Sequence, residues 1–135
     1  MDDEGPVTSD DVNLVRLRGR VSGAPERRVL PSGDEVVALR VVVRRPDSET
    51  VDALDVSVGP APGPGGRRSD GQVGRRVLAT AERLSVDDRV EVAGELRRRW
   101  WDAGGARRSR LEVRATTVRA SPVDEPADEI AATSV

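Results

Sequence analysis

Residues 90–101 read V-E-V-A-G-E-L-R-R-R-W-W and alternate apolar with polar side chains, as a β-strand does. One face, expected to be buried, carries Val90, Val92, Gly94 and Leu96. The other face, expected to meet water or a ligand, carries Glu91, Ala93, Glu95, Arg97, Arg99 and Trp101. An indole beside guanidinium groups suits stacked bases and phosphates, so Trp101 is a candidate base-stacking residue. The alternative is that both tryptophans fill the core, and for Trp100, on the buried face, we predict that outcome.

The composition restricts the chemistry open to this chain of 135 residues, a length that suits one domain. All 22 basic residues are arginine, and lysine, histidine and cysteine are absent. An ordinary zinc site, a thiol nucleophile, an imidazole base and a lysine Schiff base are therefore excluded. The pair Asp87-Asp88 has the chemistry for Mg²⁺, but its place before a strand favours a solvated turn. We expect a binding protein with no catalytic residues, no metal and no cofactor, not an enzyme.

The cellular location follows from weaker signals. The absence of cysteine fits a reducing interior. The N-terminus is acidic and no apolar run approaches about 18 residues, so the pattern predicts neither a signal peptide nor a membrane span. We expect a cytoplasmic protein without membrane partners.

Charge is segregated along the chain, although the net charge is only −2. Residues 1–11 carry five acids and no base, and residues 121–135 carry four acids and no base. The remaining 15 acids stand against 22 arginines in residues 12–120, a balance of +7. The basic body predicts a polyanionic partner. Both tails are predicted to be disordered, and they either compete with that partner, recruit basic proteins or only keep the protein soluble.

The expected elements are five strands and one helix. Alternation predicts strands over residues 12–23, 35–45, 51–58, 90–101 and 107–119, with a short extended piece at 27–30. Apolar residues at helical spacing predict a helix over 75–85, after a loop rich in glycine and proline at 59–74. The fold class is therefore all-β, and this order is that of the five-stranded OB-fold barrel with one helix between strands 3 and 4. Other small β-barrels share much of the pattern.

Two segments resemble the bacterial single-stranded DNA-binding proteins. The first is Asn13-Leu14-Val15-Arg16-Leu17-Arg18-Gly19-Arg20-Val21, continued by Pro25-Glu26-Arg27-Arg28, Pro31-Ser32-Gly33 and a valine-rich strand. The second is Gly94-Glu95-Leu96-Arg97-Arg98-Arg99-Trp100-Trp101, similar to the family's Gly-x-Leu-x-x-Arg-x-Trp segment. The resemblance covers roughly residues 12–120, apart from the 59–74 loop.

The resemblance implies a barrel that binds single-stranded DNA without reading its sequence, as an accessory protein in DNA replication, repair or recombination at the nucleoid. It places Trp101 at a base-stacking position and Arg28 at a basic one. Arg97 and Arg99 lie on the face of Trp101 and are expected to contact phosphate. The strand faces add four further candidates for phosphate contact, namely Arg40, Arg44, Arg110 and Arg114. For any single arginine the alternative is a solvated strand face.

The departures from the family predict how this chain differs. Two stacking positions of the family fall at Ala53 and near Arg44 or Arg45, so only Trp101 keeps an aromatic ring. We therefore expect weaker DNA binding, with a steeper salt dependence, than in typical members of the family. The family's homodimer or homotetramer packs apolar residues where Arg16 and Arg18 stand, so like charges oppose the usual pairing. The C-terminus lacks an aromatic tip, so recruitment of other proteins through it is not expected. The competing function is an OB-fold protein-interaction or assembly subunit with little nucleic-acid binding.

Overall fold

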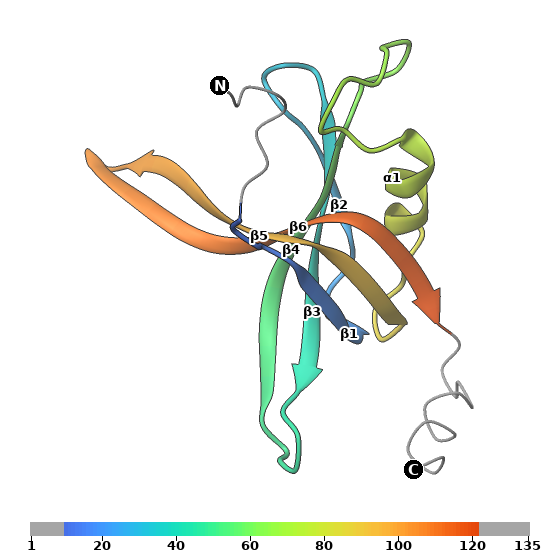
Figure 1. Cartoon of the computed structure of the whole chain (residues 1–135), viewed down its shortest axis with the longest axis vertical. Coiled ribbons are helices and arrows are strands. Elements are labelled where there is room, and N and C mark those ends of the chain that lie inside the picture. The colour runs from blue at the N-terminus through green and yellow to red at the C-terminus, as the bar shows by residue number, and fades with distance from the viewer. Residues whose placement is uncertain (1–9, 122–135) are drawn as a thin grey trace.

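The structure, a computed structural model, describes residues 10–121 (Figure 1). The acidic tails, predicted to be disordered over residues 1–11 and 121–135, fall almost wholly outside the described residues. The domain predicted over residues 12–120 lies within them. No described helix is long and apolar enough to span a membrane.

The described chain forms six strands and one helix, close to the predicted elements. They are β1 (Val15–Val21), β2 (Glu26–Val29), β3 (Glu35–Arg44), β4 (Val51–Ala61), α1 (Arg75–Glu82), β5 (Arg89–Ala103) and β6 (Ala106–Ser121). The short β2 is the predicted extended piece, so the helix follows the third of the five long strands, as expected. Strand β4 runs three residues further than predicted, into the start of the expected loop, and α1 ends three residues earlier.

The five long strands close into a barrel, which confirms the predicted OB fold. Strand β5 lies between β1 and β6, β4 lies between β6 and β3, and β3 returns to pair with β1. All neighbours are antiparallel except β4 and β6, where Val56 pairs with Val113 in parallel. Strand β2 pairs with β3 on the outside of this closed sheet.

The core is filled mainly by valines that alternate along the strands. Its fully buried side chains include Val37, Val41, Val56, Val58, Val90 and Val92. Each such side chain contributes about 1.5–3 kcal/mol relative to an exposed one. Helix α1 covers one end of the barrel with Leu78 and Ala81, and the buried Glu35 holds the helix start through Arg75 Nη1 at 3.1 Å.

Two glycines allow backbones to approach closely where the barrel closes. A glycine inside a strand indicates a bend or a close backbone approach. At Gly19 the structure has a close approach, since a Cβ atom there would lie 2.2 Å from the carbonyl oxygen of Val42. At Gly94 the Cβ atom would lie 1.9 Å from the carbonyl oxygen of Arg114. Gly94 marks the point where β5 leaves the barrel, since its pairing with Val15 is the last between β1 and β5.

From Arg97 on β5 to Glu112 on β6, the two strands pair only with each other and project from the barrel as a two-stranded arm (Figure 1). We call residues Glu95 to Glu112 the hairpin arm. The expected burial of Leu96 and Trp100 is wrong: Leu96 is 41% exposed and Trp100 is 52% exposed. The predicted alternation holds along β5, but no part of the barrel covers this end of the buried face.

A β-bulge in β6 changes which face of the strand Thr117 occupies. The partner of Ala93 is Thr117, whereas the partner of the next residue, Gly94, is Ala115. Thr116 is therefore the extra residue, and Thr117 lies on the opposite face from Ala115. Strict alternation through residues 107–119 predicts Thr117 on the same face as Leu111, Val113 and Ala115, and that prediction is wrong for Thr117 alone.

Candidate nucleic-acid interface

An open groove of about 790 Å³ runs across the outer face of the barrel and along the hairpin arm. Its floor comes from β2, β3 and β4, and its wall comes from the outward side chains of β5 and β6. The charged residues that line it are Glu26, Arg28, Arg40, Asp55, Arg97, Arg98, Arg99, Arg110, Glu112 and Arg114. The Arg98 side chain lies over Trp100 on the opposite face of the arm, so six arginine side chains against three carboxylates give this groove a net charge of +3.

Most of the predicted binding residues come together in this groove, although they come from four strands. Six of the eight line it, namely Arg28, Arg40, Arg97, Arg99, Arg110 and Arg114. Sequence reasoning missed the groove's three acids. It left Arg98 out because strand alternation places that side chain on the face opposite Arg97 and Arg99, where the structure has it. The grouping follows from barrel closure, which brings the outer faces of β3, β4 and the arm to one side.

Trp101 stands beside the groove, on the same face of the arm as two of its arginines. The guanidinium carbons of Arg99 and Arg110 each lie 5.8 Å from the centre of its ring. Arg99 precedes Trp101 by two residues, and Arg110 is the cross-strand partner of Arg99. The ring is only partly exposed because these side chains lie against it. Cation–π contacts of this kind contribute about 0.5–1 kcal/mol at exposed sites and orient the ring.

Asp55 lies between two of the predicted phosphate-binding arginines. Its Oδ1 accepts hydrogen bonds from Arg40 Nε at 3.2 Å and Nη2 at 3.1 Å, and its Oδ2 accepts one from Arg110 Nη1 at 3.0 Å. Arg40 is on β3, Asp55 on β4 and Arg110 on β6, so the carboxylate joins three strands across the groove floor. A phosphate oxygen would have to compete with Asp55 for the same donors.

Two more groove arginines have acidic partners close in sequence. Arg28 Nη2 donates to Glu26 Oε1 at 2.9 Å, and Arg97 Nη2 donates to Glu95 Oε2 at 2.5 Å. Both arginine side chains are 50% exposed, and ion pairs this exposed are worth about 0–1 kcal/mol. Such pairs orient the arginines without preventing a phosphate from replacing the carboxylate.

Arg99 and Arg114 have no carboxylate within 4.0 Å among residues 10–121. The Nε atom of Arg114 is also buried without a hydrogen-bond acceptor in that part of the chain. These two arginines are therefore the groove cations that an incoming phosphate engages without displacing an acid.

Arg44 is the predicted binding residue that the structure leaves furthest from the groove. It is the last residue of β3, in a hairpin with β4 that projects from the opposite end of the barrel from α1 (Figure 1). Its neighbour Arg45 donates two hydrogen bonds to the carboxylate of Asp52, at 3.1 and 2.9 Å. This bond lowers the pKa of Asp52. Arg44 could reach only a ligand that extends past the groove.

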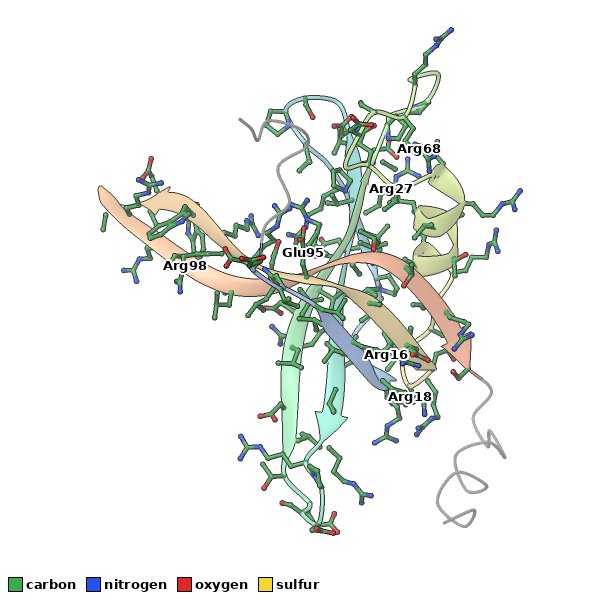
Figure 2. All side chains as sticks on the ribbon, viewed as in Figure 1. Arg16, Arg18, Arg27, Arg68, Glu95 and Arg98 are labelled. Carbon is green, nitrogen blue, oxygen red and sulfur yellow. The ribbon has the colours of Figure 1, made fainter. Side chains whose placement is uncertain are left out.

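A separate charge cluster lies on the outer face of β1, β5 and β6. Glu91, whose side chain is 10% exposed, pairs with Arg16, with Arg18 at 3.5 Å and with Arg119 at 3.0 Å. The hydrogen bonds from Arg16 and then Arg119 lower the pKa of Glu91. Figure 2 shows Arg16 and Arg18 well away from Arg98 on the arm, so these arginines do not belong to the groove.

The acidic pair considered for Mg²⁺ forms a turn. Asp88 Oδ2 accepts a hydrogen bond from the backbone N–H of Ser85 at 2.8 Å, and Asp87 has a positive φ of 76°. Across residues 10–121 no three acidic side chains gather in a way that would hold a metal ion.

Comparison with solved structures finds the same barrel fold in other proteins. No protein-family model matches the sequence, and no curated protein sequence does. The N-terminal domain of PriB from Thermoanaerobacter tencongensis, described as dimeric, matches 82% of this chain and 97% of its own length, with a TM-score of 0.56 and 24% identity. The Plasmodium falciparum SSB in complex with ssDNA matches 86% of this chain and 100% of its own, with a TM-score of 0.62 and 18% identity. At these identities the likeness shows the fold.

Proposed function

We propose that the protein binds single-stranded DNA in the groove without reading its sequence. One observation carries the proposal. Barrel closure gathers six arginine side chains on one face, and the hairpin arm sets the Trp101 ring beside them. Guanidinium groups bind phosphate, and an indole stacks on any base, so the combination suits a strand of any sequence. That one solved structure with this fold is a complex with ssDNA supports the proposal.

The binding mode we propose depends more on charge than on stacking. Base–aromatic stacking is worth about 1–3 kcal/mol per base, and the groove face carries one ring, at Trp101. Each neutralised phosphate of a single strand contributes a slope of about −0.7 to the plot of log K against log[salt]. An arginine-lined groove therefore predicts moderate affinity with a strong dependence on salt. In this proposal the protein is a binding module, not an enzyme, and it acts at the nucleoid as an accessory protein in replication, repair or recombination.

The direct test is a salt series with labelled oligo(dT), its duplex counterpart and oligo(U), followed by fluorescence anisotropy. We expect binding to oligo(dT) at low salt, weaker binding to the duplex, and a log–log slope that indicates several neutralised phosphates. The double variant Arg99→Gln/Arg114→Gln should reduce that slope by about 1.4, since two phosphate contacts are lost. The matched control is Arg76→Gln/Arg83→Gln, at exposed positions of α1 and just after it, which should leave the slope unchanged.

The competing function is that of a protein-interaction or assembly subunit with little nucleic-acid binding. The hydrogen bonds of Asp55 favour it, because this carboxylate already satisfies donors of Arg40 and Arg110. The same salt series separates the two functions. Absence of salt-sensitive binding to any single strand at low ionic strength would favour the subunit and contradict the groove as a nucleic-acid site.

We also propose that the chain associates with itself as a homodimer or homotetramer. One protein with this fold is described as dimeric, which supports the idea. The like charges of Arg16 and Arg18 on the outer face of β1 are met by Glu91, so an acid lies between them. The mass in solution, measured by light scattering in the binding buffer, decides the oligomeric state, and a monomer mass at all concentrations would contradict the proposal.

A further inference from the structure

The hairpin arm has a second face, opposite the groove, that nothing described so far uses. Its large apolar side chains are Leu96, Trp100 and Leu111, which are 41%, 52% and 50% exposed. They continue the inward face of β5 and β6 past the end of the barrel. Leu96 lies on that face because it pairs with the buried Val113, whereas Arg97, the next residue of β5, faces the groove.

Two arginines lie over the exposed ring on this second face. The guanidinium carbon of Arg107 is 4.7 Å from the centre of the Trp100 ring, and that of Arg98 is 5.8 Å away. Arg98 Nη1 also donates a hydrogen bond to Ser109 Oγ at 2.9 Å, which holds it across the two strands of the arm. The arrangement repeats that around Trp101, where Arg99 and Arg110 flank the ring on the other face.

We propose that Trp100 is a second base-stacking site, and that the strand held in the groove passes around the edge of the arm to reach it. The inference rests on the proposed function and deepens it: the arm is contacted on both faces, by Trp101 on the groove side and Trp100 on the other. Arg98 and Arg107 supply the positive charge for the phosphates that flank the stacked base.

Three features favour a nucleic-acid strand over a protein partner as the occupant. Both edges of the arm are open beyond Leu96, whose backbone is hydrogen-bonded to the Asn13 side chain, and beyond Val113, the last residue of β6 to pair with β4. Arg98 stands between the groove residues Arg97 and Arg99 and its side chain lies over Trp100, so the two surfaces are the two faces of one hairpin. A second copy of the chain packed on this face would bring a surface with the same positive charges against Arg98 and Arg107, and like charges repel.

The test uses the fact that the chain has two tryptophans. Trp101→Leu leaves Trp100 as the only emitter, and Trp100→Leu leaves Trp101. Each variant is titrated with a labelled oligo(dT), whose anisotropy reports binding independently of tryptophan emission. We expect oligo(dT) to quench Trp100 emission in Trp101→Leu. We also expect Trp100→Leu to weaken binding of long oligonucleotides by about 5- to 150-fold, the equivalent of one stacked base, with a smaller loss for oligonucleotides too short to leave the groove.

Each outcome decides between the inference and the proposed function. If labelled oligo(dT) binds Trp101→Leu but its Trp100 emission is unchanged, the groove binds DNA and Trp100 does not, which overturns the inference alone. If Trp100 emission instead changes with protein concentration in the absence of DNA, a second copy covers the ring and the inference is likewise overturned. If no oligonucleotide binds even the unaltered protein, the proposed function fails, and the inference with it.

Discussion

The barrel and the hairpin arm share strands β5 and β6 but serve different purposes. Within the barrel, β5 contributes Val90 and Val92 to a core that excludes solvent completely. Ten residues later the same face of the same strand presents Trp100 to solvent. Strand alternation therefore determines which side of the sheet a residue occupies, and the surrounding elements determine whether that side is buried.

The two regions also differ in what holds them together. Apolar burial stabilises the barrel, at about 25 cal/mol per Å² of area removed from water. The arm has cross-strand hydrogen bonds, cation–π contacts and exposed ion pairs, each worth about 1 kcal/mol or less. Substitutions in the barrel should therefore change stability, and substitutions in the arm should change binding.

The largest expected effect is at the junction of the two regions. Gly94→Val would place a side chain where a Cβ atom already lies 1.9 Å from the carbonyl oxygen of Arg114 and 2.9 Å from the Cα atom of Ala115. Because both contacts are with backbone, β5 and β6 must separate, and we expect a loss of about 3 kcal/mol or more in the free energy of unfolding. Urea denaturation followed by circular dichroism measures it. Leu96→Ala, two residues into the arm, is the control and should cost less than about 1 kcal/mol.

Trp101→Ala should weaken DNA binding more than it lowers the free energy of unfolding. Removing the ring should weaken oligo(dT) binding by about 1–3 kcal/mol, because one stacked base is lost. Its effect on the free energy of unfolding should stay within about 1 kcal/mol, since the ring lies outside the core. Anisotropy titration and urea denaturation of the same preparation compare the two quantities. Equal binding by the variant and the unaltered protein would contradict the stacking role of Trp101.

Asp55→Asn tests the groove floor, where barrel and arm meet. Removing the charge frees Arg40 and Arg110 from their shared carboxylate while keeping a side chain of the same size. We expect affinity for oligo(dT) to rise by about 1 kcal/mol and the salt dependence to become steeper. Asp52→Asn, at the far end of β4, is the matched control, because its partner Arg45 lies outside the groove. Tighter binding by both variants would point to net charge alone.

The smallest expected effect concerns the barrel face that carries Glu91. Arg16 and Arg119 lower the pKa of Glu91 in the folded state. The ionised carboxylate therefore stabilises the fold at pH values above 4.5, the ordinary pKa of this group. That contribution is lost as the pH falls below 4.5 and the group takes up a proton. Glu91→Gln should therefore be less stable than the unaltered protein at pH 7, with the difference shrinking towards pH 3. Glu49→Gln, in the exposed loop after β3, is the control, and thermal unfolding across this pH range measures both.

The sequence predicted the barrel well because its signals are local. Alternation in residues 35–45 and 51–58 placed Val37, Val41, Val56 and Val58 inward, and all four are buried. Gly19 indicated a close approach that the structure contains. The bulge at Thr116 was missed because a single extra residue leaves no mark in an alternating pattern and exists only in the pairing of β6 with β5.

The candidate site was predicted less completely, since it depends on contacts between strands distant in sequence. Outward parity identified Arg40, Arg97, Arg99, Arg110 and Arg114, all of which line the groove. It did not reveal that Asp55, fifteen residues from Arg40 and fifty-five from Arg110, accepts hydrogen bonds from both. Nor did it separate Arg44 from the others. Arg40 and Arg44 lie on the same face of β3, but only Arg40 lies where the strand borders the groove.

By itself, the sequence determined the order of the strands, the faces of their side chains and the excess of arginine in residues 12–120, because alternation and charge are properties of neighbouring residues. Only the tertiary structure decided where the barrel ends along β5 and β6, and so which indole is exposed and which guanidiniums meet a carboxylate. The physical reason is that burial and ion pairing depend on what lies across the sheet, and those partners are brought there by barrel closure.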